Sequence, residues 1–246
     1  MDRVILAGGV CSADLREATG CNLRAELPVR CKPTAQHVAD ELRQAGGDGQ
    51  TIVVGYEVEG CLTAPAGNGF IGSLGNGLDR VASETFLLAA ADLPFLTASS
   101  VAAFLAKCDP EMALNYPVIP VEACERAFPG MRRTSIKLRE GRFTGGNIAL
   151  ANTDLMKRIF PVLEKAHANR KLPLKLALQV GLGALLRVVV GQIVPGTLPL
   201  AILEKRVGSF LGAPVRAVIT EHADIGADVD NLDQYQQAVR ILGRKA

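Results

Sequence analysis

The chain opens with Arg3-Val4-Ile5-Leu6-Ala7-Gly8-Gly9, an apolar run that leads directly into two glycines. Such a run predicts a buried β-strand that ends in a loop. Because glycine has no Cβ, the backbone N–H groups of this loop can approach a ligand closely and point at it together, which suits phosphate. A tight turn after a strand would use the same two residues, so this motif alone leaves both interpretations open.

Strand, loop and helix follow one another through the first half of the chain. Apolar runs predict strands at residues 3–7, 52–54 and 86–91. Helical spacing predicts one helix from Pro33 to Ala45, and Thr97 is a candidate N-cap of another. Three strand–helix units in succession predict an α/β fold with a doubly wound, mostly parallel sheet.

The glycine-rich stretch APAGNGFIGSLGNG, after the second strand, is expected to be a loop that leads into a short helix around Leu78–Ala82. In the second half, we expect strands at residues 116–121, 148–151 and 215–219. Further elements expected there are an alternating strand and turn in RTSIKLREGRF, a helix from Asn152 or Thr153 to about Ala168, and a terminal helix after an acidic loop.

Residues 174–211 are very apolar and are expected to be helical. A membrane span is disfavoured because Arg187 would lie within the membrane and the run LALQVGLGALLRVVVGQIV contains three glycines. A buried helical hairpin, a homodimer face and a lipid-facing surface remain as interpretations. We therefore expect a single domain over residues 1–246 with a helical insertion at about 170–212.

The composition excludes several classes of protein. Lys and Arg number 27 against 25 Asp and Glu, and no basic run with interleaved aromatic residues occurs, so a small-molecule partner is expected rather than nucleic acid. The six cysteines form no C-x-x-C motif, which favours reduced thiols in a cytoplasmic protein. No charged region followed by an apolar segment opens the sequence, so secretion is not expected.

Carboxylates at predicted strand ends carry the chemical signal. Asp92 directly follows the third strand, at the edge where open parallel sheets bind ligands. Asp228 and Asp230 alternate on an extended segment and so point to the same side. If Asp92 and Asp230 converge, their oxygens would hold Mg²⁺ together with water and phosphate oxygens. A helix or turn cap is the alternative role for each residue.

These motifs together resemble the nucleotidyltransferases of the MobA-like NTP transferase superfamily, which have a nucleotide-diphospho-sugar transferase (GT-A, Rossmann-like) fold. The resemblance rests on L-A-G-G after the first strand, K-P at a helix start, V-V-G, D-x-P after the third strand, G-G-N before a later strand and V-D-N before the last helix. It covers residues 3–152 and 213–243. The superfamily includes molybdenum-cofactor guanylyltransferases and sugar-1-phosphate nucleotidylyltransferases.

The resemblance implies an enzyme that moves an NMP group from an NTP to a phosphorylated small-molecule acceptor, with release of pyrophosphate. It assigns base and phosphate binding to Leu6, Ala7, Gly8 and Gly9, the Mg²⁺ ion to Asp92 and Asp230, and the acceptor to Gly145, Gly146 and Asn147. In-line phosphoryl transfer needs positioning and charge neutralisation rather than a covalent nucleophile.

The basic residues of the first loop depart from the usual pattern L-A-G-G-x-x-x-R-M-G-x-x-K. Here Arg16 comes later, no R-M-G occurs, and Arg24 in LRAELP stands where the family has the lysine of K-A-L-L-P. Arg16, Arg24 and Lys32 are the candidate phosphate-neutralising residues, although a guanidinium and an ammonium are not interchangeable.

The sequence also bears on two other classes of function. A dinucleotide-binding dehydrogenase would have G-x-G-x-x-G at the first turn, whereas this chain has G-G-V-C-S-A. A non-catalytic protein that binds a nucleotide or sugar nucleotide through a degraded loop remains open. Magnesium-dependent pyrophosphate release separates that protein from a transferase.

Overall fold

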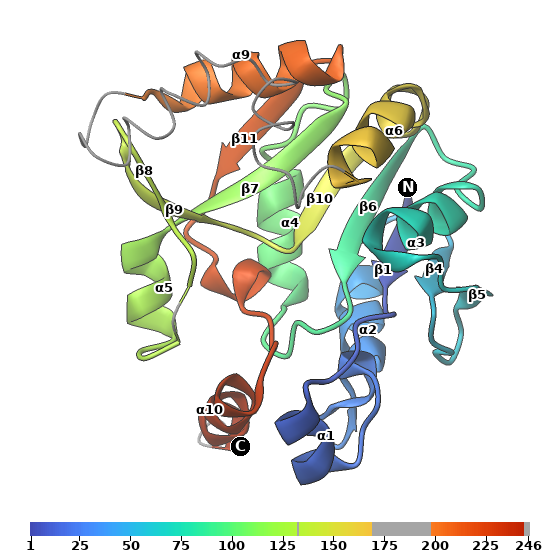
Figure 1. The fold of residues 1–246 in the computed structure, drawn as a ribbon, viewed down its shortest axis with the longest axis vertical. Helices are drawn as coiled ribbons and strands as arrows, with labels where there is room; N and C mark the ends of the chain where they lie inside the picture. The colour runs from blue at the N-terminus through green and yellow to red at the C-terminus, as the bar shows by residue number, and fades with distance from the viewer. Residues whose placement is uncertain (132, 169–197, 244–246) are drawn as a thin grey trace.

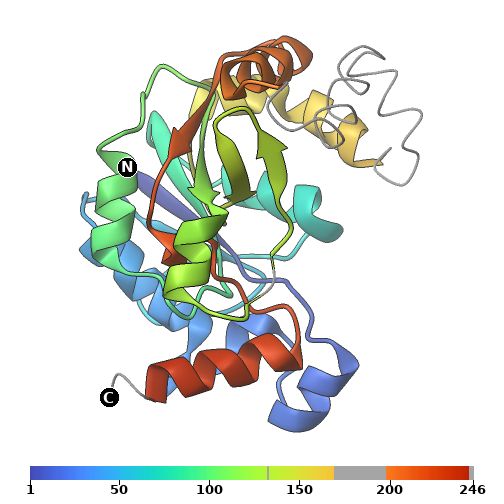
Figure 2. The same cartoon turned by 90° about the vertical axis from the view of Figure 1, so that its left-hand side faces the viewer.

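A computed structural model describes residues 1–131, 133–168 and 198–243. In this part of the chain, one nine-stranded sheet carries helices on both faces (Figures 1 and 2). Its strands are β1 (Asp2–Leu6), β4 (Thr51–Val54), β5 (Leu62–Ala64), β6 (Thr85–Ala90), β7 (Leu114–Pro120), β8 (Ile136–Leu138), β9 (Gly141–Gly145), β10 (Ile148–Asn152) and β11 (Val215–Ile219).

The sheet has the order β5-β4-β1-β6-β10-β7-β9-β8, and β11 pairs with β7. The pairings β5–β4, β4–β1, β1–β6 and β7–β11 are parallel, and only β9 and β10 run against the other strands of this sheet. The mostly parallel, doubly wound α/β sheet predicted from the sequence is therefore confirmed. A separate two-stranded ribbon consists of β2 (Pro28–Val29) and β3 (Lys32–Pro33).

The described helices are α1 (Ala13–Thr19), α2 (Thr34–Gln44), α3 (Gly69–Leu78), α4 (Ala98–Leu105), α5 (Val121–Ala127), α6 (Thr153–Ala168), α9 (Leu200–Leu211) and α10 (Leu232–Gly243). Two short 3₁₀ helices are η1 (Arg24–Glu26) and η2 (Ala223–Gly226). In Figure 2, α2 and α4 lie on one side of the central strands, and α3 and α6 lie on the other.

Successive residues of each central strand face opposite sides of the sheet and enter different cores. Ile5 and Leu87 pack in the cluster that contains Val38 of α2 and Phe104 of α4. Residues that face the other side of the same sheet, including Val4, Ile52 and Phe86, pack in the second cluster. There they meet Leu78 of α3 and Met156 and Ile159 of α6. Burial on both faces explains why these strands read as continuous apolar runs.

The glycine-rich stretch is helical earlier than predicted. The helix α3 covers Gly69–Leu78 itself, so the prediction of a loop followed by a helix around Leu78–Ala82 was wrong. Ile71, Leu74 and Leu78 are buried at helical spacing. The glycines serve close packing: a Cβ on Gly77 would lie 2.6 Å from Val4 Cγ1, and one on Gly75 would lie 3.0 Å from the Phe160 ring.

The G-G-N motif forms a bulge between β9 and β10. On β7, Val118 pairs with Gly145 and Asn115 pairs with Leu150, so a three-residue step on β7 corresponds to a five-residue step on its partner. The bulge redirects the chain from β7 toward β6, where Asn147 accepts a 2.9 Å backbone hydrogen bond from Ala90 N–H.

Much of the apolar segment 174–211, and with it the predicted insertion and homodimer face, lies outside the described residues. Its last part is helical as expected, because α9 spans Leu200–Leu211. In the part of the chain that the structure describes, no helix combines the length and the hydropathy needed to cross a membrane.

We predict that Gly77→Ala destabilises the protein by about 1–3 kcal/mol, because the added methyl group overpacks α3 against β1 and β4. The matched control is Gly243→Ala, since among the described residues no atom outside the backbone of its own helix lies within 4 Å of a Cβ at that position. Both changes raise helix propensity, so the difference between them isolates the steric cost. Equal free energies of unfolding for the two variants in urea denaturation would contradict this packing argument.

Candidate functional site

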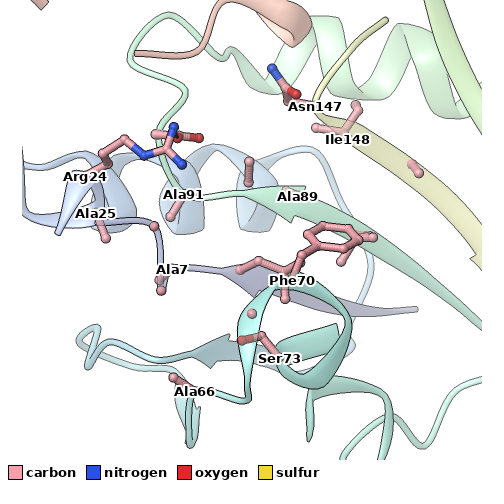
Figure 3. Close-up of a pocket in the computed structure, with 18 of the residues that line it drawn as sticks. Ala7, Arg24, Ala25, Ala66, Phe70, Ser73, Ala89, Ala91, Asn147 and Ile148 are labelled. Carbon is pink, nitrogen blue, oxygen red and sulfur yellow. Dashed lines mark ion pairs between the residues drawn. The ribbon is translucent and has the colours of Figure 1, made fainter. Parts of the chain in front are cut away.

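A cavity of about 520 Å³ opens at the carboxyl ends of β1 and β6. Its size is typical of small-molecule sites. Figure 3 shows Arg24 and Ala25 on one side of it, Asn147 and Ile148 on another, and Phe70 and Ser73 on α3. The cavity is lined by Leu6, Ala7, Gly8, Gly9, Arg24, Ala25, Ala66, Gly67, Gly69, Phe70, Ser73, Leu88, Ala89, Ala90, Ala91, Asp92, Tyr116, Gly146, Asn147, Ile148 and Ala149.

The first glycine loop is held by backbone bonds on both sides. Ala7 N–H donates to Val54 on β4, and Leu6 C=O accepts from Ala91 after β6. Between described residues, no hydrogen bond uses the backbone N–H of Gly8 or Gly9. These two donors therefore remain available to an anion in the cavity.

The acidic segment before α10 is fixed to the end of the third parallel strand. Val229 N–H donates a 3.1 Å hydrogen bond to the backbone carbonyl of Asp92. Asn231 Oδ1 accepts from Gln234 N–H and so caps α10. The capping role therefore belongs to Asn231, which leaves the Asp230 carboxylate for other contacts.

Arg24 lies between the two carboxylates that the sequence singled out. Its Nη1 is 2.8 Å from Asp92 Oδ2 and also contacts Asp230 Oδ1. The backbone N–H of Arg24 donates to Gly9 C=O at 2.8 Å, so η1 is attached to the glycine loop. A Cβ on Gly9 would lie 2.7 Å from Arg24 Nη2, and the absent side chain is what admits the guanidinium.

The buried position of Asp92 makes its ionised form costly. Burial raises the pKa of Asp92 to about 6, with repulsion from Asp228 and Asp230 adding to the rise and Arg24 opposing it. The pKa of Asp228 is also raised, first by burial and then by Asp230. Arg133 Nη1 lies 3.7 Å from Asp228 Oδ1, so a second arginine faces this cluster.

The other predicted site residues fall into two groups. Gly146 and Asn147 line the cavity, and Gly145 packs so closely on Tyr116 that a Cβ there would lie 2.3 Å from the phenol oxygen. Arg16 and Lys32 are not among the lining residues. Arg16 Nη2 is 3.5 Å from Cys11 C=O, and Lys32 pairs with Asp40 on α2.

Sequence reasoning missed Phe70, Ser73, Tyr116 and Arg133. Phe70 is 54% exposed although it lines the cavity, and Ser73 Oγ accepts a 3.0 Å hydrogen bond from Gly67 N–H. The spacing of Ile71, Leu74 and Leu78 in the glycine-rich stretch was the signal that would have placed the first two on a helix.

The donor set of this site fits a hard divalent cation. Mg²⁺ is typically held by one or two carboxylates together with waters and phosphate oxygens, and Asp92 and Asp230 supply two carboxylates. Among the described residues, no three His, Cys, Asp or Glu side chains converge to form a complete protein cage. A metal here would therefore take the rest of its ligands from substrate and water.

A doubly wound sheet with a glycine loop and paired aspartates at the carboxyl ends of its strands is the arrangement in which open α/β sheets bind ligands. The model of the MobA-like NTP transferase domain matches residues 3–172, and this chain belongs to that family of nucleotidyltransferases. A comparison with proteins of curated function gave no match.

Solved structures agree with this assignment. A hypothetical transferase from Thermus thermophilus is 34% identical, with 95% of this chain and 98% of that chain covered and a TM-score of 0.85. CMP:2-keto-3-deoxy-manno-octonic acid synthetase complexed with CTP is 13% identical over 100% and 99% of the two chains, with a TM-score of 0.60. Rv0371c from Mycobacterium tuberculosis H37Rv, complexed with manganese, is 16% identical over 97% of each chain, with a TM-score of 0.52. The last two likenesses support the fold alone.

The raised pKa of Asp92 predicts a pH-dependent stability. An unfolded aspartate has a pKa of about 3.9, so between that pH and about 6 the folded chain keeps a proton that the unfolded chain has lost. Stability contributed by this group therefore falls as pH rises through this window. We expect Asp92→Asn to be more stable than the unchanged protein by about 1–3 kcal/mol at pH 8, and the difference to vanish below about pH 4.

Urea denaturation at a series of pH values measures this difference. The matched control is Asp233→Asn, because Asp233 is exposed in the first turn of α10. A free-energy difference between Asp92→Asn and the unchanged protein that stays constant from pH 4 to pH 8 would show that Asp92 does not titrate in this range.

Proposed function

We propose that this protein is a magnesium-dependent nucleotidyltransferase that moves an NMP group from an NTP to a phosphorylated small-molecule acceptor. The observation that carries the proposal is that the Gly8-Gly9 loop, Arg24 and Asp92 line the same cavity and that Arg24 also pairs with Asp230. Membership of the family supports NTP transfer in general. CTP and manganese in the two distant structures are consistent with a nucleotide and a divalent ion as ligands.

The reaction proposed is an in-line displacement at the α-phosphorus. An oxygen of the acceptor phosphate forms the new bond to this phosphorus, the bond to the bridging oxygen breaks, and pyrophosphate leaves with that electron pair. The glycine N–H groups and Arg24 would hold phosphate oxygens, and Asp92 and Asp230 would hold the metal, which supplies charge neutralisation. The protein's part is to orient the reactants and to hold their charge.

The assignments along the cavity remain proposals. Leu6, Ala7, Gly8 and Gly9 would contact base and phosphates, and the Gly145-Gly146-Asn147 bulge would contact the acceptor beside Tyr116. The phosphate role falls to Arg24, which faces the glycine loop. For Arg16 and Lys32 that role stays a prediction, because they contact Cys11 and Asp40 instead.

The proposal is tested by measuring pyrophosphate release from each of the four NTPs with Mg²⁺, in the presence of mixed small-molecule phosphates. A thermal-shift screen of the same NTPs identifies the base first, since a ligand at a hundred times its Kd adds about 2.7 kcal/mol. Binding of an NTP with no Mg²⁺-dependent release of pyrophosphate would support the non-catalytic binding protein instead.

We predict that Asp92→Asn and Asp230→Asn each lower the rate of pyrophosphate release by about 10²–10³-fold while the fold survives, because each removes a carboxylate that would hold the metal, and the metal is what neutralises charge at the α-phosphate. Asp233→Asn, a change of the same chemistry on α10, should keep the unchanged rate. Loss of turnover in Asp228→Asn with turnover retained in Asp230→Asn would reverse the assignment within this pair. Retained turnover in both Asp92→Asn and Asp230→Asn would refute the metal site.

A further inference from the structure

The position of Arg24 bears on how a metal could enter the site. One nitrogen, Nη1, contacts both Asp92 Oδ2 and Asp230 Oδ1. A magnesium ion shared by these two oxygens would lie about 2.0–2.1 Å from each of them. The guanidinium nitrogen already occupies the space between those oxygens, and two cations cannot share it.

We propose that Arg24 is a resident counterion of Asp92 and Asp230, and that the phosphates of an incoming nucleotide draw it away before a divalent cation bridges the two carboxylates. This inference rests on the proposed function. It gives Arg24 two successive partners, first the carboxylates and then the phosphates. Metal and nucleotide would consequently bind as a linked pair.

The surroundings of Arg24 provide the alternative position. Its main chain is bonded to Gly9, and Nη2 and Nε lie 2.7 and 2.9 Å from the point that a Cβ on Gly9 would occupy. The guanidinium is therefore already stacked against the glycine loop. Its Nε is buried without a hydrogen-bond partner in the part of the chain that the structure describes. A phosphate oxygen on the loop would supply that missing partner.

The choice of arginine fits this double role better than lysine does. A planar guanidinium presents donors in several directions, so it can hold carboxylates at one nitrogen while its other nitrogens face the loop. The ammonium of a lysine is a compact point charge on a flexible stem. This double role is a physical reason for arginine at position 24, where the family usually has lysine.

A purely structural ion pair makes a different prediction. If Arg24 only fastened η1 to the sheet edge, its removal would lower stability and leave divalent-ion affinity unchanged or weaker. If it competes with the metal, its removal would strengthen metal binding in the absence of nucleotide. By linkage, a nucleotide that removes Arg24 raises metal affinity, and the metal raises nucleotide affinity by the same factor.

The test is a titration of the nucleotide-free full chain with Mn²⁺, in which electron paramagnetic resonance measures the free ion. We expect Arg24→Gln to bind Mn²⁺ at least about tenfold more tightly than the unchanged protein, since a unit positive charge beside both carboxylates is lost. Arg24→Lys should fall between the two. The matched control is Arg126→Gln, which loses the same charge from an exposed pair with Glu221 on the surface.

A second titration adds α,β-methylene analogues of the four NTPs. In the unchanged protein, the bound analogue should tighten Mn²⁺ binding roughly 5- to 150-fold, the usual range of coupling between sites. In Arg24→Gln this gain should shrink, because the competitor has already gone. Thermal unfolding and circular dichroism check the fold of each variant, and Arg24→Lys carries the test if Arg24→Gln does not fold.

An unchanged or weaker Mn²⁺ affinity in folded Arg24→Gln overturns the counterion role, even if the unchanged protein releases pyrophosphate from an NTP. Absence of Mg²⁺-dependent pyrophosphate release overturns the proposed function and is read in a separate assay. A tighter nucleotide-free Mn²⁺ affinity in Arg24→Gln together with pyrophosphate release by the unchanged protein supports both.

Discussion

The hydrogen bond from Val229 N–H to Asp92 C=O is the constraint on which the site depends. It joins the end of the third parallel strand to a segment near the end of the chain. Because the bond is made by the backbone, it fixes where the side chains of Asp228 and Asp230 emerge without using either carboxylate. The cap provided by Asn231 has the same effect, since α10 starts with a side chain other than Asp230. Both carboxylates are therefore free to face cations.

Glycines at close contacts between elements determine the shape of the cavity. Gly55 has a φ of 89°, and a Cβ there would lie 3.3 Å from Gly8, so the loop after β4 approaches the loop after β1 closely because Gly55 lacks a side chain. Gly77 brings α3 down onto the same strands, and this places Phe70 and Ser73 at the cavity. Bulkier residues at these positions would separate the layers and widen the cavity.

The sequence predicted the parts of this protein that follow from local pattern. The apolar runs around Ile5, Ile52 and Leu87 marked the central strands because each strand is buried on both faces. It did not predict α3, because the glycines that allow close packing also read as loop residues. The pairing of Arg24 with Asp92 and Asp230 could not be predicted either, since it depends on backbone bonds, from Arg24 to Gly9 and from Val229 to Asp92, that join segments far apart in the sequence. From the sequence, Mg²⁺ was expected at these carboxylates and Arg24 at the phosphates, but the structure places Arg24 between the two carboxylates.

Charge at the sheet edge explains why a protein of this design would need a divalent ion. Asp92, Asp228 and Asp230 carry three negative charges when ionised, and Arg24 and Arg133 face them with two positive charges. The cluster is thus near balance before any ligand arrives, and it holds no surplus of positive charge to offset a triphosphate. Burial already makes ionised Asp92 costly, as its raised pKa shows. A triphosphate that approached without a cation would meet repulsion from all three carboxylates. A divalent ion that arrives with the phosphates would reduce that repulsion. In the sequence proposed above, this ion bridges Asp92 and Asp230 after the phosphates have drawn Arg24 away from them.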